Sequence, residues 1–241
     1  MSLEKPYLPL PGAEASFEEW ASAHPLKDLP PLPSRTVGYW TEPWCGVVTV
    51  AGISALLISL TTGSVDAEVT VDQSVCGLLV TAIWSWAGIA LICTAYIVFG
   101  RAGEIRRCPA ACYPIPGEVA QRLVSLQSLE GLQNVNGPEG RTYCVRCLVW
   151  RPPPKVAGRS HHCNICQRCV TGFDHHCGVF GRCIVDGNMP CFYLVMAMFF
   201  LGSVTSIGAL MVSSGPPAVH RYSHTTVGPE IPASTTVLWV N

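Results

Sequence analysis

Three long stretches of the chain contain no charged residue, at positions 43–65, 73–100 and 187–218. Their hydrophobic residues come in blocks and do not alternate with polar ones. Each stretch exceeds the roughly 20 residues that an α-helix needs to cross the hydrocarbon core of a bilayer. The pattern therefore predicts three transmembrane helices, at residues 45–62, 77–99 and 191–212.

The composition is too poor in charge for a typical soluble protein of this length. Of the 241 residues, 49% are hydrophobic and only 13% are charged, whereas soluble domains carry about 25% charged residues. No repeat period runs along the chain. These observations argue against a soluble enzyme, a disordered chain, a fibrous repeat and a small secreted domain held by disulfides.

The segments that flank the predicted helices differ strongly in basic residues. The loop 63–76 contains no lysine or arginine, whereas 11 of the 15 basic residues, against 6 acidic ones, lie between positions 101 and 186. Because short loops rich in lysine and arginine stay in the cytosol, we expect residues 101–186 to be cytosolic and the loop 63–76 to be lumenal. The tail 213–241 is then lumenal.

The same topology places the N-terminal arm, residues 1–42, in the cytosol. The arm is rich in proline and lacks the basic start and the apolar core of a signal peptide. We therefore predict a solvated, proline-rich arm. Aromatic residues at its end lie where an interfacial belt would begin: Tyr39, Trp40 and Trp44.

The segment 101–142 is predicted as a cytosolic linker. Within it, apolar residues recur at intervals of three and four: Val119, Leu123, Leu126, Leu129 and Leu132. This spacing predicts an amphipathic helix between Gly117 and Val135. We interpret the helix as a connector that packs on the neighbouring domain or lies on the membrane surface, and a partner-binding helix is the alternative.

Cysteine and histidine are concentrated in one short segment of the chain. Seven of the 13 cysteines and four of the seven histidines fall between Cys144 and Cys183. Nested Cys-x-x-Cys pairs with interspersed histidines indicate zinc sites in a reducing compartment, since a disulfide framework needs no histidine. Two closed tetrahedral sites use eight ligands, so three of the eleven candidates are left over. The spacing alone does not decide which three.

Within this segment stands the tetrad Asp174-His175-His176-Cys177, inside a cysteine-rich domain between predicted spans. The chain thereby resembles the DHHC family of protein S-acyltransferases (palmitoyltransferases), at motif level from Tyr143 to Phe192. The resemblance implies an α-helical integral membrane protein with a cytosolic, two-zinc DHHC domain, here at residues 143–190. It also implies a fourth transmembrane helix, of which residues 235–240 are the expected start before the chain ends.

The family pattern assigns the candidate ligands to two zinc ions. One ion would be held by Cys144, Cys147, His162 and Cys169, and the other by Cys163, Cys166, His176 and Cys183. The residues left over are Cys177, His175 and His161. By the family's mechanism, Cys177 is the nucleophile, His175 its base and Asp174 the residue that orients His175.

The chain departs from the family pattern close to the tetrad. Gly178 and Val179 stand where proline and tryptophan are usual, Arg182 stands where asparagine is common, and Val185 replaces a usual glycine. About five extra residues also precede Arg159. We expect these changes to affect rate and substrate choice more than the fold.

The leading hypothesis is a zinc-stabilised protein S-palmitoyltransferase with acyl-CoA, such as palmitoyl-CoA, as donor. Its partners would be the lipid bilayer and substrate proteins with a cysteine near the membrane, at the Golgi, endoplasmic reticulum or plasma membrane. The alternative is a catalytically impaired or truncated DHHC protein that serves as a partner-binding scaffold. A membrane-tethered zinc finger that binds nucleic acid is a third reading. We expect no nucleic acid, because the basic residues form no helical stripe and membrane topology already accounts for them.

Overall fold

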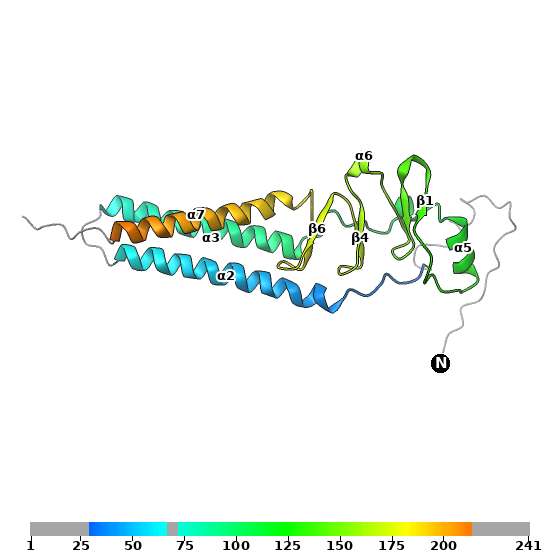
Figure 1. Ribbon diagram of the computed structural model, residues 1–241, viewed down its shortest axis with the longest axis horizontal. Coiled ribbons are helices and arrows are strands. Elements are labelled where there is room, and N and C mark those ends of the chain that lie inside the picture. The colour runs from blue at the N-terminus through cyan, green and yellow to red at the C-terminus, as the bar shows by residue number, and fades with distance from the viewer. Residues whose placement is uncertain (1–28, 67–71, 214–241) are drawn as a thin grey trace, which may run out of the picture.

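The computed structural model describes residues 29–66 and 72–213 (Figure 1). Several sequence predictions fall partly or wholly on the other residues. Most of the proline-rich arm 1–42, part of the loop 63–76, and the tail 213–241 from its second residue lie outside the described residues. The expected start of a fourth span at residues 235–240 lies outside them as well.

Three long helices lie side by side and carry a small β-rich domain at one end (Figure 1). They are α2 (Val37–Asp66), α3 (Gln73–Phe99) and α7 (Met189–Ser213). All three are long and apolar enough to cross a membrane, by length and composition. The predicted architecture of three such helices with a cysteine-rich domain is thereby confirmed. The helix ends differ from the predicted spans, most of all in α2, which begins at Val37 instead of Cys45.

Small and polar residues hold the three helices together. The hydroxyls of Thr61 and Ser206 lie 2.9 Å apart in the buried interface of α2 and α7, and Ser206 also donates to the Leu57 carbonyl at 3.2 Å. The Trp86 indole donates to the Thr205 hydroxyl, linking α3 to α7 at 3.3 Å. Such contacts are typical of helix packing in membranes, where the hydrophobic effect between helices is weak.

The β-rich domain consists of three short antiparallel units. The first sheet contains β1 (Val135–Asn136), β2 (Thr142–Cys144) and β3 (Val149–Arg151). The second contains β4 (His161–Cys163) and β5 (Arg168–Val170), and the third contains β6 (Phe173–Cys177) and β7 (Arg182–Val185). The predicted linker 101–142 therefore contributes β1 and the start of β2 to the first sheet.

The first two β-hairpins turn in the same way. Leu148 and Gln167 each follow the second cysteine of a Cys-x-x-Cys pair and have positive φ angles of 55° and 53°. The Leu148 amide donates to the Cys144 carbonyl at 2.7 Å, and the Gln167 amide donates to the Cys163 carbonyl at 2.8 Å. These turns bring both sulfurs of each pair to the same end of the hairpin.

Short helical segments lie between the strands or before them in the chain. They are α4 (Pro109–Cys112), α5 (Gly117–Val124), the 3₁₀ turn η2 (Pro138–Gly140) and α6 (Pro154–Ala157). The α6 turn is formed within the extra residues that precede Arg159, and its Val156 is exposed. It projects away from the rest of the domain (Figure 1).

The amphipathic helix predicted between Gly117 and Val135 is shorter than its apolar repeat. It ends as α5 at Val124, because Leu126 adopts a left-handed conformation with φ 52°. The Gln127 amide then donates to the Arg122 carbonyl at 2.9 Å, and the Leu126 amide donates to the Leu123 carbonyl at 3.3 Å. This pair of bonds is the Schellman arrangement that closes a helix.

The apolar repeat nevertheless has a packing role beyond the end of α5. Leu129 and Leu132 follow in a non-helical segment and pack on the same core as Leu123. That core surrounds Tyr143, Val149 and other buried residues of the first sheet. The repeat therefore indicated the packing of its other members correctly, whereas Leu126 is 81% exposed and the helix is shorter than predicted.

The third hairpin joins the β-rich domain to the helices. Phe180 and Ile184 from this hairpin are buried in one cluster with residues of α2, α3 and α7: Val50, Ala90, Cys93, Ile97, Val98, Val195 and Met198. Gly181 has φ +57°, and a Cβ at this position would overlap Pro43 of α2. A Cβ at Gly46 would lie 2.5 Å from the Val179 carbonyl oxygen. The N-terminal turns of α2 thus touch the backbone of the β6–β7 turn.

Replacing Gly181 by alanine should weaken the contact between the β6–β7 turn and α2. The left-handed conformation costs a residue with a Cβ about 1–2 kcal/mol, and the new Cβ would also overlap the Pro43 ring. We expect Gly181→Ala to lower the free energy of unfolding by about 2 kcal/mol or more. Thermal unfolding of the purified protein in detergent measures the effect.

Gly178, in the same turn, provides the matched control. A Cβ at Gly178 meets nothing within 4 Å, and Gly178 is not among the glycines with positive φ. Gly178→Ala should therefore leave the melting temperature nearly unchanged. Equal effects of the two substitutions would contradict the close contact between the turn and α2.

Candidate metal centres and active site

The first group of potential metal ligands lies between the first and second hairpins. It contains Cys144, Cys147, His162 and Cys169, all buried, with their ligand atoms within 4.8 Å of one another. The Nδ1 atom of His162 lies 3.5, 3.2 and 3.7 Å from the sulfurs of Cys144, Cys147 and Cys169. Three thiols and one imidazole thus converge on one point.

The second group lies between the second and third hairpins. It contains Cys163, Cys166, His176 and Cys183, again within 4.8 Å of one another. The His176 Nδ1 lies 3.4, 3.5 and 3.8 Å from the three sulfurs, in that order. The two groups share the second hairpin, because His162 and Cys163 are neighbours on β4 and neighbouring strand residues point to opposite faces.

The donor chemistry of both groups fits a structural zinc ion. Such sites are closed, tetrahedral and made of thiolate and imidazole, with Cys₃His a common set. Hydrogen bonds from Cys147 and Cys169 lower the pKa of the Cys144 thiol. Those from Cys166 and Cys183 lower the pKa of Cys163 in the same way. The same hydrogen bonds raise the pKa of Cys169 and of Cys183, because these thiols act as the donors to their neighbours.

Strand β6 carries the tetrad and separates its members between two faces. His176 points to the second group, so His175 and Cys177 lie on the opposite face of the strand. The pairing of β6 with β7 shifts register between Phe173 and His175, which leaves Asp174 in a bulge. From there the Asp174 carboxylate reaches the His175 Nδ1 at 2.7 Å.

His175 and Cys177 are both partly exposed, and each packs near the boundary with the long helices. The His175 side chain is 43% exposed and packs edge-on against the Phe192 ring, with centroids 5.6 Å apart. Cys177 belongs to neither metal-ligand group. It is partly buried and packs on the cluster of Phe180 and Ile184, where the domain meets the helices. The thiol therefore lies at the boundary between the two parts of the protein.

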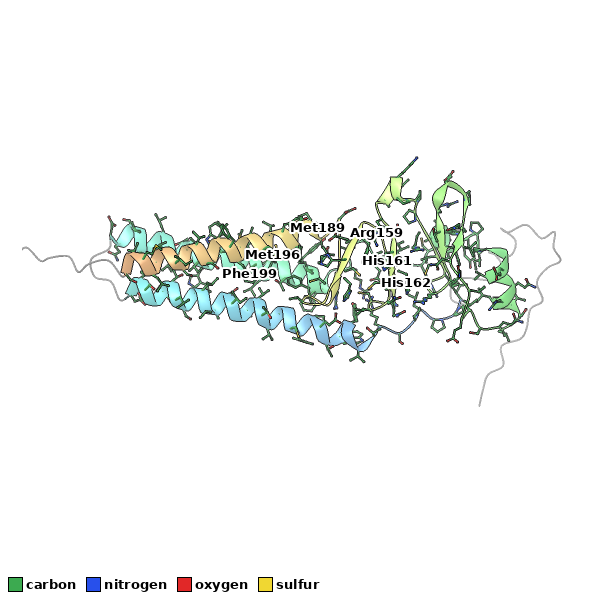
Figure 2. All side chains as sticks on the ribbon, in the orientation of Figure 1. Arg159, His161, His162, Met189, Met196 and Phe199 are labelled. Atoms are coloured by element: carbon green, nitrogen blue, oxygen red, sulfur yellow. The ribbon has the colours of Figure 1, made fainter. Side chains whose placement is uncertain are left out.

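His161 is the third of the residues left over. It belongs to neither group, and its ring stacks on Phe173 with centroids 4.4 Å apart. Burial lowers the pKa of His161, which favours the neutral ring. In Figure 2, His161 and His162 lie within the β-rich domain, whereas Met196 and Phe199 follow α7 away from it. His161 thus packs against Phe173 and belongs to neither ligand group.

The family comparison agrees with this geometry. The model of the DHHC palmitoyltransferase family matches residues 138–229. The chain carries a DHHC palmitoyltransferase domain. The match includes both metal-ligand groups, the tetrad and all of α7. A search of curated proteins gave no match.

Arg182, one of the departures of this DHHC domain from the family pattern, forms hydrogen bonds to two of the long helices. Arg182 donates from Nε to the Val98 carbonyl and from its terminal nitrogen to the Tyr39 carbonyl, both at 2.8 Å. The helices leave both acceptors free: Val98 is in the last turn of α3, and the helical donor for Tyr39 would be Pro43, which has no N–H. The guanidinium also lies 3.8 Å from the Tyr39 ring centroid.

Sequence reasoning missed one residue at the edge of the second group. Glu42, in α2, lies outside the family match, and its carboxylate is 2.9 Å from the His176 Nε2. The two residues are 134 positions apart. The only signal in the sequence is that Glu42 is the last acidic residue before the first uncharged stretch. That position is ordinary for a membrane helix and does not indicate a contact.

Proposed function

We propose that the protein is an S-acyltransferase that moves a long-chain acyl group from acyl-CoA to cysteines of substrate proteins through an acyl-Cys177 intermediate. The observation that carries the proposal is the separation of roles on β6. Cys177 stands outside both ligand groups, shares a strand face with His175, and His175 is held by Asp174 at 2.7 Å. The family match supports the same activity.

Each metal-ligand group would hold one zinc ion in this proposal. The first ion would be bound by Cys144, Cys147, His162 and Cys169, and the second by Cys163, Cys166, His176 and Cys183. When bound, zinc supplies structural cross-links between hairpins that have only short strands and little core of their own. Cys177, bound to no metal, remains available as a nucleophile.

The proposed chemistry uses Asp174 and His175 to activate Cys177. The Asp174 carboxylate accepts a hydrogen bond from the Nδ1–H of His175, which leaves Nε2 free to take the proton of the thiol. The Cys177 thiolate attacks the carbonyl carbon of the acyl-CoA thioester. A new sulfur–carbon bond forms, and coenzyme A leaves as a thiolate that takes up the proton.

The second half of the reaction reverses these roles. The cysteine of the substrate protein gives its proton to His175, its thiolate attacks the acyl-Cys177 thioester, and Cys177 leaves as a thiolate that takes up that proton. The acyl donor is a long-chain acyl-CoA such as palmitoyl-CoA. The acceptors are membrane-associated or cytosolic proteins with a cysteine near the bilayer. The compartments proposed are the Golgi, endoplasmic reticulum or plasma membrane.

Acyl labelling tests the nucleophile. Incubated with a long-chain acyl-CoA, the purified protein should gain a covalent label that hydroxylamine removes, because the bond is a thioester. Cys177→Ser should abolish the label, and His175→Ala should slow it by about 10²- to 10⁴-fold through loss of the base. Labelling is measured by gel fluorescence with an alkyne-tagged acyl-CoA.

Cys108→Ser is the matched control, since Cys108 is exposed and lies outside both ligand groups. It should label like the unchanged protein. A folded protein that takes no label, or labels equally without Cys177, would reject the acyltransferase and support the partner-binding scaffold.

Metal analysis tests the ligand sets. The purified protein should contain two zinc ions per chain, and Cys169→Ser and Cys183→Ser should each reduce the count to one. The loss should also destabilise the fold, because structural zinc binding contributes apparent free energies on the order of 10 kcal/mol. Cys177→Ser should keep both ions. Elemental analysis that finds one zinc or none in the unchanged protein contradicts the assignment.

Protease protection tests the proposed orientation. The β-rich domain lies at one end of the three long helices. We propose that this end is cytosolic, because short segments rich in lysine and arginine stay in the cytosol. A tag inserted after the exposed Glu139 should be cut by protease added to sealed microsomes. A tag inserted within residues 67–71 should be protected until detergent is added. The opposite pattern would reverse the topology.

A further inference from the structure

The histidine of the second ligand group has a partner on each of its ring nitrogens. Its Nδ1 faces the sulfurs of Cys163, Cys166 and Cys183. Its Nε2 lies 2.9 Å from the Glu42 carboxylate. If Nδ1 binds metal as a neutral imidazole, the proton must sit on Nε2, which then donates to Glu42. A carboxylate in that position fixes the tautomer and the ring orientation of a metal-binding histidine.

The first group has no such partner. The Nε2 of His162 is buried without a hydrogen bond in the part of the chain that the structure describes. The two groups therefore differ in one feature although their donor sets are the same. Among the described residues, the second group alone is tied to a carboxylate, which comes from the span-capable helix α2.

The contact between Glu42 and His176 is partly shielded from water. The His176 side chain is 12% exposed and that of Glu42 is 28% exposed. Two neighbours of Glu42 along α2 touch the same hairpin, because Pro43 contacts Gly181 and Gly46 faces the Val179 carbonyl. The helix backbone that carries Glu42 is therefore packed closely against the hairpin that carries His176.

Space for the carboxylate is provided one helical turn earlier. A Cβ at Gly38 would lie 2.6 Å from the Glu42 Oε1. A Cβ at this position would require the carboxylate, whose other oxygen meets His176, to shift. Gly38 thus leaves a gap that the Glu42 side chain fills.

We propose that Glu42 is a positioning residue that locks the second zinc site, and with it the catalytic strand β6, to the helix α2. This inference rests on the proposed function, which supplies the zinc and the role of Cys177. His176 stands between His175 and Cys177 in the strand, so a turned or loosened His176 disturbs both neighbours. Loss of such an outer partner typically costs about 10- to 100-fold in metal affinity or activity.

The experiment measures zinc release from the purified full-length protein in detergent. Excess chelator is added, and the released metal is followed with a chromogenic zinc indicator. Glu42→Ala should speed the release of one of the two ions by about 10- to 100-fold and leave the other unchanged. Glu42→Gln keeps the side-chain size and an acceptor oxygen, so it should give a smaller increase. The acyl label on Cys177 should slow in the same order.

Two further variants separate positioning from general stability. Thr41→Ala is the matched control on the same turn, since Thr41 is exposed and bonds only to Val37 within its own helix. It should leave both release rates unchanged. Gly38→Ala raises helix propensity by up to about 1 kcal/mol but displaces the carboxylate. It should therefore speed release of the same ion as Glu42→Ala without lowering the melting temperature.

Assignment of the affected ion uses Cys169→Ser, which lacks a ligand of the first group. In that background Glu42→Ala should still accelerate the remaining ion. Unchanged release in Glu42→Ala, or equal acceleration of both ions, overturns the inference about Glu42 alone. Absence of zinc from the unchanged protein overturns both the inference and the proposed metal sites. A normal zinc count without a Cys177 label removes only the catalytic consequence.

Discussion

The alternation of side chains along a β-strand is the constraint on which the site depends. Strands β4 and β6 are short, and in each of them adjacent side chains point to opposite faces and serve different sites. On β4, His162 joins the first ligand group and Cys163 joins the second. On β6, His176 alone faces the second group, so the residues on either side of it are directed away. A one-residue slip of β6 would exchange metal ligand and nucleophile.

A second constraint fixes this strand relative to the three long helices. At 1.5 Å per residue, α2 is about 45 Å long, whereas the hydrocarbon core of a bilayer is about 30 Å thick. The extra turns at its N-terminal end continue alongside the third hairpin. Pro43 leaves the Tyr39 carbonyl without a helical donor, and Arg182 of β7 supplies one at 2.8 Å. The hairpin thus supplies a hydrogen bond that the helix cannot make for itself.

The features that could be predicted from the sequence are those set by local pattern. Blocks of apolar residues predicted three span-capable helices because length and hydropathy alone decide that question. The end of α5 was not predicted because the residue that closes the helix in a left-handed conformation is Leu126. Glycine or asparagine is the usual residue at such a position, so leucine gives no signal of a helix end. The contacts of Glu42 and Arg182 were missed for another reason. They join segments far apart in the chain, and neither residue type indicates its partner by spacing.

The position of Cys177 suits a substrate that is apolar at one end and polar at the other, as a long-chain acyl-CoA is. Each methylene of the acyl chain favours an apolar environment by about 0.8 kcal/mol, whereas the thiolate, the base and coenzyme A all require water. Under the proposed function, the Cys177 sulfur lies where an apolar environment for the acyl chain and a polar one for the reacting groups meet. Its thiol packs on the cluster shared with α2, α3 and α7, and His175, on the same strand face, remains exposed. A nucleophile deeper among the helices would lose its base, and one farther out in the domain would leave the acyl chain in water.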